Sequence, residues 1–246
     1  LALIIYGDLD ISVLDELPPG RQKIETYAVG AAYRRRIYAF IKKHIAQGFQ
    51  AYIVCPLVEE GESELPAARE YARRLQNGEF SGCRVGLLHG RMKAQEKDAV
   101  MRAFAAGAID LLVSTTVVEV GVDVPNAVVM VVEQADRFGL SQLHQLRGRV
   151  GRGTQKSYCI LISDAGEESE AKKRLSVMVE TADGFKIADE DLRQRGPGDF
   201  FGARQHGLPE LKIADMMQDM EVLRVCAACA EELLDEDPGL SKDAHK

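Results

Sequence analysis

Short apolar runs alternate with amphipathic stretches through the first two thirds of this 246-residue sequence, and this alternation limits the possible folds most. Continuous apolar runs at 109–114 and 127–132 are typical of strands buried on both faces of a sheet. Alternating strand and helix patterns predict βαβ units and a parallel sheet covered by helices. We expect strands at 24–29, 51–57, 85–88, 109–114, 127–132 and 157–162, and helices at 33–47, 66–76, 93–106 and 140–150.

Composition excludes several classes of protein. The formal net charge of −7 argues against indiscriminate coating of nucleic acid, although it permits a local basic track. Cys55, Cys83 and Cys159 stand singly in apolar runs and are expected to be buried, reduced thiols, which fits a cytoplasmic protein. Cys226 and Cys229 have C-x-x-C spacing without a second ligand pair, so we expect no metal site there. No apolar run approaches the length of a membrane span.

The segment QLRGRVGRG at 145–153 has the residue types of a polyphosphate contact. On a helix Arg149 and Arg152 would share a face, with Gln145 one turn earlier. Gly148 and Gly151 would each cost a helix about 1 kcal/mol relative to alanine, so we expect the backbone there to approach something bulky and charged. Guanidinium groups match phosphate geometry well. The alternative is a solvated basic helix end.

Two further polar clusters follow predicted strands. Thr115 and Thr116 end the strand at 109–114, where hydroxyls can bond phosphate oxygens and a nearby carboxylate such as Asp123 can take a ribose hydroxyl. An ordinary turn explains this cluster equally well. The run His89-Gly90-Arg91 follows the strand at 85–88, and taken alone it is better explained as a loop that contains a histidine.

The 246 residues contain no G-x-x-x-x-G-K-[ST] segment, so they lack the loop that usually cradles a triphosphate. The sequence therefore predicts the sensing half of a nucleotide site without the binding half.

Together these motifs resemble the second motor lobe of superfamily 2 helicases, and most closely the RecG family of bacterial ATP-dependent helicases. The resemblance rests on YGDLD at 6–10, DELPPGR at 15–21 and the run 133–153. The segment 183–207, from DGF to RQHG, resembles a translocation motif that RecG shares with the transcription-repair coupling factor. That coupling factor is the first alternative, and a non-enzymatic nucleotide-sensing or DNA-binding module is the second. The linker at 15–21 favours RecG.

The resemblance implies a RecA-like three-layer α/β lobe with a mostly parallel sheet at 24–165. Residues 1–23 would be the tail of a first motor lobe and a linker, and 166–246 a translocation hairpin with a mainly helical C-terminal region. A P-loop, magnesium-binding acids and a wedge domain would then lie elsewhere in a longer protein. The 246 residues alone are accordingly expected not to hydrolyse ATP.

The resemblance also implies roles for single residues. Arg149 and Arg152 would be arginine fingers, with Gln145 in the same catalytic motif, directed at ATP with Mg²⁺ that the first lobe mainly binds. The other implied residues are Gly148, Gly151, Glu119, Gly121 and Asp123 for the nucleotide, His89, Gly90, Arg91, Thr115 and Thr116 for DNA, and Arg174, Arg195 and Gln205 for translocation coupling.

The implied partners follow from the same family. They are branched double-stranded DNA, such as forks and Holliday junctions, and the wedge domain and first lobe of the same protein. Single-stranded DNA-binding protein is a further candidate partner. We expect a monomer in the bacterial cytoplasm, associated with the nucleoid and not with a membrane.

Overall fold

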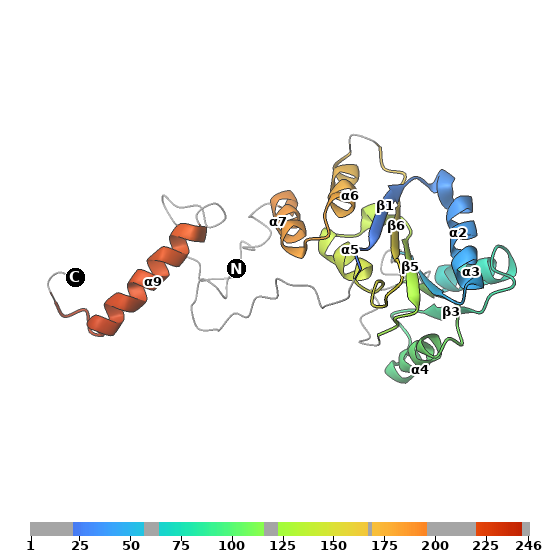
Figure 1. Cartoon of the computed structure of the whole chain (residues 1–246), viewed down its shortest axis with the longest axis horizontal. Coiled ribbons are helices and arrows are strands. Elements are labelled where there is room, and N and C mark those ends of the chain that lie inside the picture. The colour runs from blue at the N-terminus through green and yellow to red at the C-terminus, as the bar shows by residue number, and fades with distance from the viewer. Residues whose placement is uncertain (1–21, 57–63, 116–122, 167–168, 196–219, 243–246) are drawn as a thin grey trace. The chain divides into compact units, whose positions relative to one another are not determined.

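The computed structural model describes residues 22–56, 64–115, 123–166, 169–195 and 220–242. Within these ranges six strands form one sheet in the order β1-β6-β5-β2-β4-β3 (Figure 1). Every neighbouring pair is parallel, which confirms the predicted type of sheet. The strands are β1 Glu25–Val29, β2 Gln50–Val54, β3 Val85–Leu88, β4 Leu111–Ser114, β5 Ala127–Val132 and β6 Tyr158–Ile162.

Residues 116–122, between β4 and β5, are not described. Helices connect the other successive strands, as the alternating pattern predicts. They are α2 Arg34–Ala46, α3 Glu64–Asn77, α4 Ala94–Ala105 and α5 Leu140–Arg147, with short 3₁₀ turns η1 Ala31–Tyr33 and η2 Ala135–Arg137. After β6 come α6 Glu170–Glu180, α7 Gly184–Arg195 and α9 Met220–Glu236. The sheet, α6 and α7 belong to one compact unit over Pro18–Gln194, whereas α9 belongs to another.

The apolar core forms two layers, one on each face of the sheet. Tyr52 and Val54 of β2 pack with residues of α4, α5 and α6, whereas Ala51 and Ile53 pack with residues of α2 and α3. Figure 1 shows α2 and α3 on one side of the sheet and α5 and α6 on the other. Every residue of β2, β4 and β5 is buried, which explains why these strands are apolar apart from Gln50 and Ser114. This is the predicted RecA-like arrangement of three layers.

The helices α6 and α7 follow one another closely and begin at side-chain caps. Ser169 Oγ accepts a hydrogen bond from the Lys172 backbone N–H at the start of α6. Asp183 Oδ1 accepts one from the Phe185 N–H, at 2.9 Å, at the start of α7. Part of the segment 183–207 is therefore helical, because Asp183 satisfies a free N–H group at the start of α7.

The cysteines are free and differ in environment. Cys159 is buried, and Cys55 and Cys83 are only partly buried, so the expectation of three buried thiols is fully correct only for Cys159. Burial raises the pKa of the Cys55 and Cys159 thiols to about 12, which keeps both protonated. Cys226 and Cys229 are exposed on α9. Among the described helices, none is long and apolar enough to cross a membrane.

Candidate nucleotide and DNA site

The arginine segment begins where α5 ends, and this corrects the predicted helix at 140–150. The helix stops at Arg147 with Gly148 as its C-cap. The N–H groups of Arg149 and Val150 then donate to the carbonyl oxygens three residues earlier, which is a tight turn and not a continued α-helix. Arg149 and Arg152 therefore do not share a helix face with Gln145, which is exposed on α5.

Gly151 explains why the helix does not continue. Its φ of 75° lies in the left-handed region, which residues with a Cβ rarely adopt. A Cβ built on Gly151 would lie 2.8 Å from Cγ1 of Ile24, the residue before β1. The close backbone approach that we predicted is present at Gly151, but its neighbour is aliphatic and not charged.

The structure brings Arg149, Arg152 and Asp123 into one neighbourhood. The Arg152 Nη1 atom lies 3.4 Å from Asp123 Oδ1, and its Nε–H donates to the Gly148 carbonyl oxygen. All three charged groups act on Tyr52: burial raises the pKa of this phenol to about 12, Arg149 and Arg152 oppose that rise, and Asp123 adds to it. Asp123 precedes β5, so this group lies towards the amino ends of the strands.

A second group lies at the carboxyl ends of β3 and β4. Leu88 and Ser114 are register partners, and the Thr115 N–H donates to the Leu88 carbonyl oxygen at 3.2 Å. His89 and Thr115 come directly after these strands and are both buried, whereas Gly90 and Arg91 are exposed. The structure therefore brings His89 and Thr115, which the sequence places at the ends of two separate strands, together at one edge of the sheet.

His89 has an unusual environment. Its Nδ1 atom is buried and has no hydrogen-bond partner among the described residues. Burial, and then the nearby Arg69, lower the pKa of His89, so the ring is neutral at pH 7. A neutral ring with an unused nitrogen can accept or donate a hydrogen bond, depending on its tautomer.

Some predicted site residues are not described. Thr116, Glu119, Gly121 and Gln205 lie outside the described residues. Arg195 is the last residue of α7, and only its backbone is described.

The hydrogen bonds that join α5 and η2 to α6 were not predicted from the sequence. Arg147 is one of five arginine and lysine residues at 137–156, yet its side chain is buried and donates to the carbonyl oxygens of Met178 and Thr181. Arg174 of α6 donates to the Asp136 carbonyl oxygen at 2.6 Å, and its Nε atom is buried without a partner among the described residues. In these contacts a side chain bonds to a backbone carbonyl group, which every residue type has, so the sequence contains no pattern that predicts them.

A buried carboxylate fixes the chain just before η2. Glu133 follows β5, and Arg34 holds both of its oxygens, with Nη2 2.7 Å from Oε2 and Nε 3.1 Å from Oε1. The Tyr71 hydroxyl donates to Oε1 at 2.9 Å, and the Tyr38 hydroxyl lies 3.0 Å from that of Tyr71. The next residue, Gln134, has a left-handed φ of 47°, so Glu133 anchors a sharp turn towards α5.

Replacing Glu133 with alanine should lower the free energy of unfolding of this chain by about 3 kcal/mol. The Glu133 side chain is 8% exposed, so its removal leaves the Arg34 charge and the Tyr71 hydroxyl without their buried partner. Urea unfolding followed by circular dichroism measures the change. The matched control is Glu79→Ala, because the Glu79–Lys42 pair is exposed and should be worth less than about 1 kcal/mol. Equal losses at the two positions would contradict this role of Glu133.

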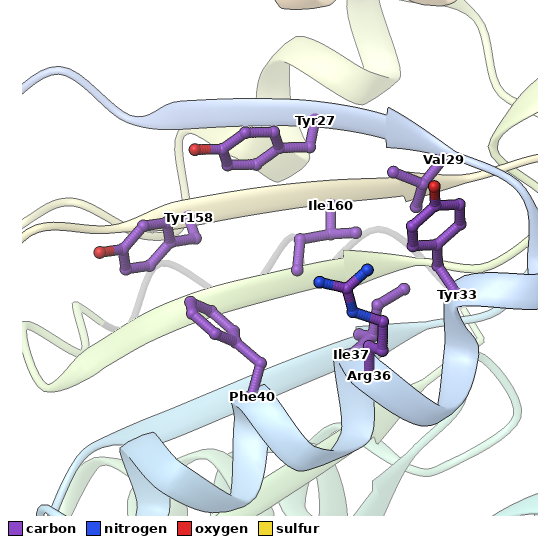
Figure 2. A pocket seen from close by; sticks show the side chains of 8 residues that line it. All are labelled: Tyr27, Val29, Tyr33, Arg36, Ile37, Phe40, Tyr158 and Ile160. Atoms are coloured by element: carbon purple, nitrogen blue, oxygen red, sulfur yellow. The ribbon is translucent and has the colours of Figure 1, made fainter.

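An aromatic cavity of about 320 Å³ lies at the β1 edge of the sheet, away from β3 (Figure 2). Tyr27 and Tyr158 come from the strands and Phe40 from α2, and the Arg36 guanidinium lies 5.7 Å from the centroid of the Tyr33 ring. None of the predicted site residues lines this cavity. It is therefore separate from both groups described above.

Arg149 is half-buried, and its guanidinium has no hydrogen bond or ion pair within the described part of the chain. Such a donor can contact phosphate oxygens. In the same ranges, no three His, Cys, Asp or Glu side chains are grouped so that they could hold a metal ion.

Comparison with known families agrees with the predicted lobe. Residues 33–154 match the helicase conserved C-terminal domain. Residues 181–246 match domain 3 of the ATP-dependent DNA helicase RecG, at its C-terminal part. The chain belongs to the RecG family. Strands β2 to β5 and helices α2 to α5 lie in the helicase match, and all of α7 and α9 lie in the match specific to RecG.

RecG proteins from distant bacteria are similar over almost the whole chain. The ATP-dependent DNA helicase RecG of Synechocystis is 50% identical over 246 residues, which are 100% of this chain and 29% of that protein. RecG of Bacillus subtilis is 50% identical over 96% of this chain and 35% of that protein. A solved structure of RecG bound to a three-way DNA junction has a TM-score of 0.72 and 48% identity, covering 90% of this chain and 28% of that one. This chain therefore spans about a third of the length of these RecG relatives.

Proposed function

We propose that this chain supplies the nucleotide-sensing lobe and the DNA-moving hairpin of an ATP-dependent helicase that remodels branched DNA. Stalled replication forks and recombination junctions are its proposed substrates. The names of the relatives support an ATP-dependent DNA helicase, and the three-way junction in the similar structure supports branched DNA as the substrate class. The observation that carries the proposal is the bonding of α5, which ends at the arginine segment, to both α6 and α7.

On the nucleotide side, Arg149 and Arg152 act as catalytic residues together with Gln145. ATP with Mg²⁺ is bound mainly by another lobe, and its hydrolysis supplies the free energy of the cycle. The two guanidinium groups stabilise the negative charge that develops on the transferred phosphoryl group. Among the described residues the guanidinium of Arg149 has no hydrogen bond or ion pair, and this supports its assignment. Supporting roles fall to Gly148, Gly151 and Asp123, and to Glu119 and Gly121 of the same motif.

On the DNA side, the contacts come from the carboxyl ends of β3 and β4. His89 and Thr115 are neighbours there, and Gly90 and Arg91 are exposed beside them. Backbone N–H groups, hydroxyls and a guanidinium can bind phosphate oxygens without reading the sequence of bases. Thr116 completes this proposed set of residues.

In this proposal, α6 and α7 couple ATP hydrolysis to the movement of DNA. The Ser141 hydroxyl of α5 donates to Asp191 of α7 at 2.8 Å, and Arg174 of α6 holds the turn before α5. When a triphosphate draws the arginine segment towards another lobe, α6 and α7 move with it and pull on the duplex. Arg195 and Gln205 are further coupling residues in this proposal.

The test uses an intact RecG enzyme that contains this chain, a synthetic fork, a three-way junction and a linear duplex of equal length. We expect ATP-dependent remodelling of both branched substrates and stronger stimulation of ATP hydrolysis by them than by the duplex. A non-hydrolysable ATP analogue and the isolated 246 residues should support neither activity. Binding of forks without any ATP-dependent remodelling would overturn the proposal. Equal stimulation by linear duplex would instead favour a translocase of the coupling-factor type.

A further inference from the structure

Arg147 is the last residue of α5, and its charged group lies inside the protein. The residue is 4% exposed. Its Nη1 atom donates to the carbonyl oxygens of Met178 and Thr181, each at 2.8 Å, and its Nη2 atom lies 3.2 Å from His144 Nδ1. Because a guanidinium has only donors, His144 Nδ1 must be the acceptor in that contact. One side chain thus joins the end of α5 to the end of α6.

The charge of Arg147 is balanced by helix carbonyl groups. Burial lowers the pKa of Arg147, and no carboxylate is bonded to it in the described part of the chain. Met178 lies in the last turn of α6 and Thr181 is the C-cap of that helix. Carbonyl oxygens at such a position lack helical partners and carry partial negative charge. A displacement of α6 relative to α5 would leave a buried cation without its acceptors.

The attachment of α6 to the α5 region has a second point. Arg174 donates to the Asp136 carbonyl oxygen, which lies in η2 just before α5. The contact of Arg147 lies at the opposite end of α5. A single contact would let two helices pivot, whereas contacts at both ends prevent rotation as well as separation.

We infer that Arg147 is a positioning residue that holds α5 and α6 together as one rigid body. A movement of Arg149, two residues further on, is then transmitted in full to α6, the first helix of the hairpin region. This inference rests on the proposed function and adds a residue to it. It assigns the two neighbouring arginines different roles, because Arg149 has no partner among the described residues, whereas Arg147 donates to two carbonyl oxygens and contacts His144. Arg147 touches neither nucleotide nor DNA in this scheme.

A purely structural role is the rival explanation. In that case Arg147 would only stabilise the fold, and replacement would lower every activity in proportion to the folded fraction. A positioning role predicts a change in the ratio between two activities. The informative quantity is therefore the number of base pairs remodelled per ATP hydrolysed.

The experiment compares Arg147→Met, Arg147→Lys and wild type in an intact RecG enzyme containing this chain. DNA-stimulated hydrolysis should stay within about threefold of wild type. The base pairs remodelled per ATP should fall about tenfold for Arg147→Met. Arg147→Lys should be intermediate, because one ammonium group can serve the two carbonyl oxygens but not His144 as well. An unchanged ratio, with both rates falling together, would overturn the inference.

Arg84→Met is the matched control. Arg84 makes comparable bonds to Asp110 but lies at the β3–β4 end of the sheet, and its side chain is exposed. Its ratio of base pairs to ATP should equal that of wild type.

A second measurement separates this inference from the proposed function. Spin labels at the exposed residues Gln142 of α5 and Glu180 of α6 report the distance between the two helices in the 246-residue chain. We expect a narrow distance distribution in wild type and a broad one in Arg147→Met. If the wild-type enzyme remodels no DNA, the proposed function fails. The rigid body of α5 and α6 is still supported if the distance distribution is narrow in wild type and broad in Arg147→Met. A distribution that stays narrow in Arg147→Met would overturn it.

Discussion

Replacing Arg149 with alanine in an intact RecG enzyme that contains this chain should lower DNA-stimulated ATP hydrolysis about 10³-fold or more. The affinity for ATP should change little. The Arg149 guanidinium has no partner within the described residues, so its removal leaves no buried charge and should not unfold the lobe. Its proposed contact is to charge that develops only as the phosphoryl group transfers, so it contributes to turnover and not to binding of the ground state.

Steady-state hydrolysis with forked DNA and equilibrium binding of a fluorescent ATP analogue measure the two quantities separately. Arg149→Lys keeps the charge but loses the planar fork, so it should recover only part of the rate. Arg102→Ala is the control, because Arg102 is exposed on α4 and lies in neither proposed group. A loss of ATP affinity as large as the loss of turnover would assign Arg149 to ground-state binding instead.

The architecture followed from local features of the sequence. Every residue of β5 is buried, and a strand covered on both faces by helices must be apolar throughout, so the run at 127–132 was informative by itself. The neighbours at the carboxyl ends of the strands could also be predicted. His89 and Thr115 each follow a strand directly, and adjacent parallel strands bring such residues together.

The end of α5 and the fate of Arg147 could not be predicted in the same way. The position of Gly151 depends on Ile24, which is distant in sequence and becomes its neighbour only when β1 joins the sheet. Arg147 and Arg149 are both arginines beside Gly148, and nothing local distinguishes them. The difference arises because the end of α6 offers carbonyl oxygens to one and not to the other. The number of arginines at 145–153 is therefore larger than the number of positive charges that this segment places at the surface.

Replacing Gly151 with alanine should lower the free energy of unfolding of this chain by roughly 2–4 kcal/mol. Two costs combine at this position. A residue with a Cβ is strained at a φ of 75°, and that Cβ would lie 2.8 Å from Cγ1 and 3.1 Å from Cδ1 of Ile24. The side chain of Ile24 is branched at Cβ and cannot easily rotate away. Urea unfolding of the two proteins measures the difference.

Gly107 provides a control that isolates the second cost. Its φ is 72°, and no atom lies within 4 Å of the Cβ that an alanine would add. Gly107→Ala should therefore cost only about 1 kcal/mol, the strain of the backbone alone. Adding Ile24→Ala to Gly151→Ala should remove the clash, so the two substitutions together should cost less than the sum of their separate effects. Equal costs at Gly151 and Gly107, or strict additivity with Ile24→Ala, would show that the contact does not hold the turn. If the contact does hold it, Gly151→Ala also displaces Arg149 and Arg152, and DNA-stimulated hydrolysis in the intact enzyme falls further than the unfolded fraction accounts for.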